Sequence, residues 1–155
     1  MTPELVQRVT VGILLIIVAV LELWLGGSAL WVLATVAALI MGGEWAGLTR
    51  ADDKRRFIQY ALCIPLALMS PLAAGPSLLA MAAIAGATVF TLIVTRNRWL
   101  AAGIPYVALP IMALLWIRMQ DNGLLLAFWA LSLVWATDIG AFFAGRNFGG
   151  PKVAP

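Results

Sequence analysis

The sequence contains no histidine and a single cysteine, and only 11% of its 155 residues are charged. Without histidine, the chain cannot form a histidine metal site, a histidine general base or a Ser-His-Asp triad. The lone cysteine, Cys63, lies within an apolar run, so no disulfide can form within the chain. Soluble globular domains are about 25% charged, and the scarcity of charge therefore excludes an ordinary soluble domain.

Hydrophobic sequence takes the place of the missing charge. Hydrophobic residues make up 63% of the chain, and the mean hydropathy is +1.00. A helix needs about 20 apolar residues to cross a bilayer, and several stretches approach that length. They cover residues 9–26, 28–48, 57–75, 78–95, 99–117 and 123–145. The sequence predicts an all-α, polytopic membrane protein with about six transmembrane helices, in a single transmembrane helical domain over residues 1–155.

The basic residues predict how these spans are oriented. If the N-terminus is cytoplasmic, nine of the ten Lys and Arg residues fall on the cytoplasmic side, and only Arg118 falls on the outer side. Cytoplasmic loops of membrane proteins carry such an excess, so both termini are predicted to be cytoplasmic. The same rule accounts for the net charge of +3, and no nucleic-acid partner is expected.

Three carboxylates fall inside the predicted spans: Glu22, Glu44 and Asp138. Ionisable residues within a membrane are costly and often functional. Glu22 lies toward the outer end of its span, where it can reach the interface. Glu44 and Asp138 are predicted at similar depth near the cytoplasmic side, where they could share a divalent cation. Equally, each could be a structural residue that is hydrogen-bonded to the backbone or to a neighbouring tryptophan.

The segment "GRNFGGPK" follows Asp138 and combines glycines with cations. Its Gly149 and Gly150 can turn backbone N–H groups toward an anion, and Arg146 and Lys152 add positive charge, so the loop could hold phosphate. It could equally be a glycine helix end with two ordinary cytoplasmic anchors. No Gly-x-x-x-x-Gly-Lys-Ser/Thr motif is present, which excludes a P-loop.

Residues 135–155, "WATDIGAFFAGRNFGGPKVAP", resemble the central motif of the phosphatidate cytidylyltransferases, also called CDP-diacylglycerol synthases. In that family a Trp-Ala-x-Asp-x-Gly-Ala-Tyr/Phe run is followed by Gly-Arg/Lys-x-Phe-Gly and then by Lys-Leu-Ala-Pro. Weaker similarities are Gly43-Glu44-Trp45, and Arg118 with Gly123. The first, third and fourth spans contribute only hydrophobicity to the resemblance.

The resemblance implies transfer of CMP from CTP to phosphatidic acid, giving CDP-diacylglycerol and pyrophosphate, with Mg²⁺ as cofactor. It implies that Asp138 is a catalytic residue and a metal ligand, with Glu44 as a second metal ligand. Arg146, Lys152 and Gly149 would contact substrate phosphate. It further implies a protein of the plasma or inner membrane with its active side in the cytoplasm, and a homodimer.

The family pattern continues into a Ser-Pro-x-Lys-Thr-x-Glu-Gly motif and a later aspartate-bearing signature, and neither occurs in these 155 residues. The chain is therefore expected to correspond to the N-terminal part of such an enzyme and to be inactive alone. Three alternatives stay open. They are a small six-span transporter or channel subunit that uses Glu44 and Asp138, a non-catalytic assembly protein of the bilayer, and a related CTP-dependent enzyme that acts on another lipid.

Overall fold

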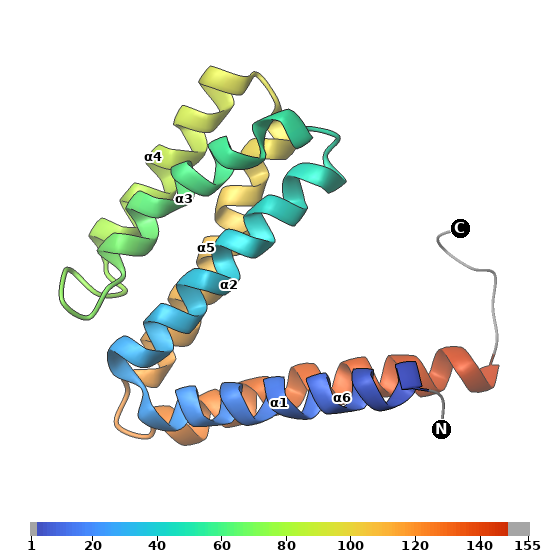
Figure 1. Ribbon diagram of the computed structural model, residues 1–155. Coiled ribbons are helices and arrows are strands. Elements are labelled where there is room, and N and C mark those ends of the chain that lie inside the picture. Colours follow the sequence, from blue (N-terminus) through green and yellow to red (C-terminus); the bar gives the residue numbers. More distant parts are fainter. Residues whose placement is uncertain (1–2, 149–155) are drawn as a thin grey trace.

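The computed structural model describes residues 3–148, and all regular structure in that range is helical, which confirms the all-α class. In chain order the elements are α1 (Pro3–Leu25), α2 (Gly27–Leu48), the 3-10 turn η1 (Asp52–Lys54), α3 (Arg55–Leu68), α4 (Leu78–Thr95), α5 (Arg98–Arg118) and α6 (Gly123–Phe148). Helices α2–α5 pack together as a bundle (Figure 1). Helices α1 and α6 run side by side as an arm that leaves the bundle at one corner (Figure 1).

Polar side chains cap the N-terminal ends of α4 and α5. The hydroxyl of Ser77 accepts a hydrogen bond from the Ala80 amide at the start of α4. The side chain of Asn97 accepts bonds from the amides of Trp99 and Leu100 at the start of α5, at 3.0 and 3.1 Å. These oxygens satisfy N–H groups that have no partner within their helices. Helix α4 ends at Thr95 and α5 begins at Arg98, so the two helices are joined by a very short turn.

Buried residues recur at four-residue spacing along α2, and all of them after the first are small. Leu30, Ala34, Ala38, Gly42 and Ala46 are all buried. Residues four apart lie on one face of a helix, and small side chains let neighbouring helices approach closely. This face contacts α3 and α5, which supply larger buried side chains: Ile58, Leu62, Leu66, Leu100, Ile104 and Val107.

The corner between the arm and the bundle depends on two glycines and one arginine. Gly26 alone separates α1 from α2, and Gly26 and Gly27 have φ values of 63° and 53°. Arg118, the last residue of α5, donates hydrogen bonds to the carbonyls of Leu23 and Trp24 at 2.8 and 3.1 Å. These are carbonyls of the last turn of α1, which lack partners within the helix. A Cβ on Gly26 would lie 3.0 Å from Nη2 of Arg118, so the corner favours glycine for both conformation and space.

The expectation of about six spans is not confirmed. Among the described residues, four helices are long and apolar enough to cross a membrane: Gly27–Leu48, Leu78–Thr95, Arg98–Arg118 and Gly123–Gly145. Helix α1 contains a shorter apolar stretch, Thr10–Leu25. These helices indicate an integral membrane protein.

The predicted span 57–75 is wrong, because α3 ends at Leu68 and residues 69–77 form turns. At 1.5 Å per residue the 14 residues of α3 are about 21 Å long, less than the bilayer core of about 30 Å. The carbonyl of Ser70 accepts bonds from the amides of Ala73 and Gly75, and its hydroxyl accepts one from Leu72. These bonds close a compact turn in place of a further helical turn.

Candidate functional site

Asp138 lies on α6, in the part of the arm that is farthest from bundle contacts. Every described residue from Ser132 to Gly145 is exposed, and Asp138 is among them. The neighbouring Thr137 hydroxyl donates to the carbonyl of Val134 at 2.7 Å, so it is occupied within the helix. The carboxylate of Asp138 is therefore presented on an open helix surface, where its oxygens are accessible to a cation or a polar ligand.

Helix α6 continues past the motif aspartate to Phe148. The continuous helical backbone places Arg146 about two turns after Asp138. Gly149 and Lys152 lie outside the described residues. Half of the segment "GRNFGGPK" therefore lies beyond the described range, and the phosphate-binding loop stays a prediction.

Glu44 lies near the end of α2, in a different setting. Its Oε1 is 3.6 Å from Nη2 of Arg55, and the Arg55 and Glu44 side chains are 53% and 72% exposed. Next to this pair, Gln59 donates to the carbonyl of Leu39 at 3.0 Å. These contacts hold the start of α3 against the end of α2. The structure thus shows Glu44 in a surface ion pair between two helices, an arrangement that was not among those expected from the sequence.

The structure does not bring Glu44 and Asp138 together. Helices α2 and α6 diverge from the shared corner (Figure 1), with Glu44 toward the far end of α2 and Asp138 in the second half of α6. Within residues 3–148, no three His, Cys, Asp or Glu side chains are grouped so that they could hold a metal ion. A cation shared by the two carboxylates finds no support in this arrangement.

A magnesium site of a simpler kind remains compatible with Asp138. Mg²⁺ in nucleotide-dependent enzymes is commonly held by one or two carboxylates together with substrate phosphates and waters. An exposed aspartate with no ion-pair partner among the described residues suits that role. Glu44 does not, because its carboxylate faces Arg55 on the bundle.

Basic residues gather at the end of the bundle that is opposite the corner. The α2–α3 and α4–α5 connections lie at this end (Figure 1). They carry Arg50, Lys54, Arg55, Arg56, Arg96 and Arg98. The corner end of the bundle carries Arg118. The described positions thus keep the charge asymmetry from which the topology was predicted, although the side of the membrane is not tested by them.

An aromatic cluster at the basic end was not expected from the sequence. The indole of Trp45 donates to the carbonyl of Trp99 at 2.8 Å and packs against Tyr106 with ring centroids 4.7 Å apart. A Cβ on Gly103 would lie 2.6 Å from Nε1 of Trp45. Gly103 therefore makes room for the ring, and the cluster joins α2 to α5. The sequence does contain a signal for this cluster: Trp45 stands near the end of α2, and Gly103 stands just after the first turn of α5.

Comparison with known proteins places the chain in a family. A family model described as "Cytidylyltransferase family" matches residues 6–155. The phosphatidate cytidylyltransferase of Brucella suis biovar 1 (strain 1330) is 30% identical over 159 residues, which covers 98% of this chain and 58% of the relative. That of Pseudomonas aeruginosa PAO1 is 31% identical over 165 residues, which covers 96% of this chain and 60% of the relative.

The chain thus spans well under two thirds of the length of these curated relatives. No solved structure gives a significant match. The family match covers almost the whole chain, including the arm, the bundle and the segment around Asp138. The chain therefore belongs to the cytidylyltransferase family.

Proposed function

We propose that the protein carrying this chain transfers CMP from CTP to phosphatidic acid. A phosphate oxygen of the lipid attacks the α-phosphorus of CTP, the bond to the β-phosphate breaks, and CDP-diacylglycerol and pyrophosphate result. The observation that carries the proposal is the family match over residues 6–155, together with relatives that are named phosphatidate cytidylyltransferase.

In this proposal Asp138 is the catalytic contribution of the described residues. Its exposed carboxylate would bind Mg²⁺ together with nucleotide phosphates. The metal, when bound, would neutralise negative charge on those phosphates. Arg146, two turns farther along α6, would contact phosphate, as would Lys152 and the backbone at Gly149. Phosphoryl-transfer catalysis consists largely of such positioning and charge stabilisation, so residues from several elements can each contribute.

We further propose that the basic end of the bundle faces the cytoplasm, in the plasma or inner membrane. The basic residues of the α2–α3 and α4–α5 connections support this orientation, because cytoplasmic loops are enriched in Lys and Arg. CTP would then reach the site from the cytoplasm, and phosphatidic acid would reach it within the bilayer. The assembly is proposed to be a homodimer, as the family resemblance implies.

A CTP-dependent lipid assay tests the proposed function. Membranes containing the full-length protein with this chain should incorporate label from [α-³²P]CTP into lipid when phosphatidic acid and Mg²⁺ are supplied. Label from [γ-³²P]CTP should appear in pyrophosphate and not in lipid. A polyisoprenyl phosphate and an ether-linked phosphatidic acid, supplied in parallel, separate the related lipid enzymes. Incorporation with none of the three lipids would overturn the proposal.

The 155 residues alone are proposed to be insufficient for turnover. The described part places only one candidate metal ligand, Asp138, in an open position, and an enzyme that handles a triphosphate requires several charge-stabilising groups. In the same assay the isolated chain should give label incorporation at the level of membranes without it. Turnover comparable to that of the full-length protein would show that these residues already complete the site.

The six-span transporter alternative gains no supporting observation. It required Glu44 and Asp138 to act together, and they lie on the bundle and on the arm respectively. In the described range Glu44 is ion-paired with Arg55 on the bundle surface. We therefore carry forward only the cytidylyltransferase function.

A further inference from the structure

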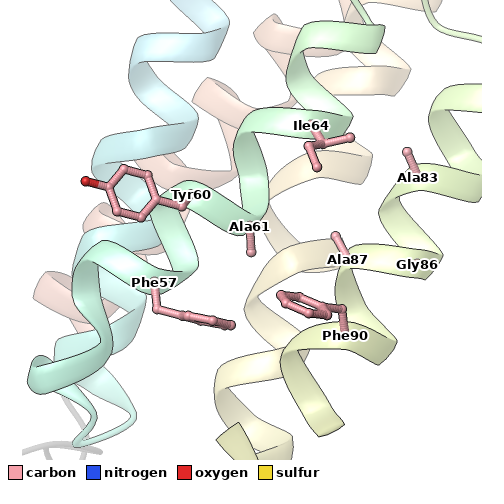
Figure 2. A pocket seen from close by; sticks show the side chains of 8 residues that line it. All are labelled: Phe57, Tyr60, Ala61, Ile64, Ala83, Gly86, Ala87 and Phe90. Carbon is pink, nitrogen blue, oxygen red and sulfur yellow. The ribbon is translucent and has the colours of Figure 1, made fainter. Parts of the chain in front are cut away.

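An apolar groove runs between α3 and α4 on the outside of the bundle (Figure 2). It encloses about 440 Å³. The lining residues are Phe57, Tyr60, Ala61, Ile64, Ala83, Gly86, Ala87 and Phe90. The hydroxyl of Tyr60 is the only side-chain polar group among them. A space of this size and polarity is suited to hydrocarbon and poorly suited to water.

Small residues open the groove, and two phenylalanines close one end of it. Ala61 of α3 faces Gly86 and Ala87 of α4 across the floor (Figure 2). The rings of Phe57 and Phe90 stack with centroids 5.9 Å apart. A Cβ added to Gly86 would meet no heavy atom within 4 Å. Gly86 is itself exposed, so a side chain placed there would extend into the open groove without collision.

The groove opens away from the bundle core. Tyr60, Ile64 and Phe90 on its rim are 71%, 67% and 55% exposed. Helix α4, which forms one wall, is among the helices long and apolar enough to span a membrane. An open apolar groove on such a helix faces lipid chains, because the hydrocarbon core contains no water to fill it. An acyl chain is the occupant that matches this position.

Basic residues stand at the end of the groove that is marked by Phe57 and Phe90. Lys54 donates to the carbonyl of Thr95 at 3.4 Å, which ties the start of α3 to the end of α4. Arg56 directly precedes Phe57, and Arg96 follows α4 in a left-handed conformation with φ 51°. Both side chains are exposed. The nearby carboxylates, Asp52 and Asp53, precede Lys54 in η1 and are exposed as well.

We propose that this groove binds one acyl chain of an anionic phospholipid of the surrounding bilayer, with the lipid phosphate on Arg56 and Arg96. The apolar lining accommodates the chain, and the two guanidinium groups complement the negative headgroup. The site is distinct from the arm that carries Asp138, and it does not depend on the proposed transfer reaction. It makes a bilayer lipid a bound component of the α3–α4 interface.

Native mass spectrometry of the chain released from mixed micelles tests the groove. Micelles contain equal amounts of phosphatidylglycerol and phosphatidylcholine, and the readout is the fraction of protein that retains one phospholipid. Gly86→Leu fills the open floor and should lower retention about tenfold, since it displaces several methylenes of the chain. Gly12→Leu is the matched control, because a Cβ on Gly12 also meets nothing within 4 Å and Gly12 lies on α1. Equal retention by the two variants would overturn the proposal.

The headgroup contact is tested by removing charge. Arg56→Gln and Arg96→Asn should each lower the ratio of retained phosphatidylglycerol to phosphatidylcholine about fivefold, as expected for one basic residue at a membrane surface. Asparagine tolerates the left-handed conformation at position 96. Arg98→Gln is the control on the same end of the bundle, because Arg98 lies over the Trp99 ring at 5.5 Å. An unchanged lipid ratio in both groove variants would contradict the assignment.

The groove could instead be filled by a second copy of the chain, and Cys63 decides between the two. It is the single cysteine, and it is exposed on α3, the helix that forms one wall of the groove. Lipid binding predicts that cross-linking between Cys63 residues in micelles is the same for the original chain and for Gly86→Leu. A strong loss of cross-linked dimer in Gly86→Leu would identify the groove as a protein interface and overturn the lipid assignment.

Discussion

The bundle and the arm of this molecule use similar apolar helices in opposite ways. In the most apolar stretch of α5, 39% of the residues are buried, against 6% in that of α6. The buried positions of α2 repeat every four residues, and one of them, Gly42, lies so close to α3 that an added Cβ would be 2.7 Å from Cδ1 of Leu62. Among the residues of α6 whose burial is described, the last buried one is Ala127, near the corner. The bundle is held by its own packing, and the arm is held mainly at one end.

The residues with the strongest family signature lie on the less packed part. Asp138 and Arg146 are on α6, whereas the cluster of Trp45, Trp99 and Tyr106 stabilises the bundle. A closely packed bundle core has no room for a substrate. An exposed helix surface, in contrast, is open to one. Under the proposed function, the bundle therefore provides a rigid scaffold and the arm carries the residues that are proposed to act on substrate. Each of the following predictions tests that division.

Asp138→Asn should have the largest effect, and only on turnover. The amide keeps the size of the side chain but loses the negative charge that binds a cation, so CMP transfer by the full-length protein should fall on the order of a hundredfold. The midpoint of thermal unfolding should stay the same, because the residue is exposed. Asp121→Asn, an exposed carboxylate in the α5–α6 turn, is the control. Near-normal turnover of Asp138→Asn would make this aspartate a structural residue.

Gly103→Ala should have the largest effect on stability. The added Cβ meets the indole of Trp45, so the ring must move and its bond to Trp99 is strained or lost. The free energy of unfolding should fall by about 1–3 kcal/mol. Gly140→Ala on the arm meets nothing within 4 Å, and it should stabilise the helix by about 0.5–1 kcal/mol. Unfolding followed by tryptophan fluorescence in micelles measures both. Equal effects would abolish the distinction between the two parts.

Arg118→Met should loosen the corner without loosening the bundle. The substitution removes the donors to Leu23 and Trp24, and the cost should be about 1 kcal/mol because the site is partly exposed. Hydrogen exchange is the sharper readout. It should speed up in the last turn of α1 and stay unchanged in α2 and α5 beyond the corner. Faster exchange throughout the bundle would show that the arginine holds the whole fold.

Glu44→Gln should have the smallest effect. An exposed ion pair such as Glu44–Arg55 contributes less than about 1 kcal/mol, so the free energy of unfolding should change by a few tenths. Unfolding in micelles with and without 0.5 M salt measures it, with the salt dependence expected to shrink in the variant. A loss of CMP transfer as large as that of Asp138→Asn would revive the shared cation and contradict the separation of bundle and arm.

Much of the helical structure could be predicted from hydropathy. The spans expected at 28–48, 78–95 and 99–117 agree with α2, α4 and α5 within about one residue at each end, and the helix from 123 was expected to stop three residues earlier than it does. The span 57–75 failed because average hydropathy concealed the turn residues. Ser70, Pro71, Gly75 and Pro76 lie in an apolar stretch, yet they favour turns over helix.

The site could be predicted only in part. The motif around Asp138 indicated the family, because a motif consists of residue types at fixed spacing, and these can be read from the sequence without a structure. The pairing of Glu44 with Asp138 was not supported, since depth along a helix says nothing about which helix stands beside it. The nearest charged group to Glu44 is Arg55, across a short connection between α2 and α3. The roles of Arg146, Gly149 and Lys152 stay predictions.

The arm is attached to the bundle at the corner around Gly26 and Arg118, so a rotation of the arm relative to the bundle would pivot there. Asp138 lies 15 residues beyond Gly123, where α6 leaves the same corner, which at 1.5 Å per residue is roughly 22 Å along the helix. A rotation of about 10° at the pivot would displace its carboxylate by roughly 4 Å, more than the length of a hydrogen bond. Residues that touch neither substrate nor metal, above all Gly26 and Arg118, would thus set where the chemistry takes place.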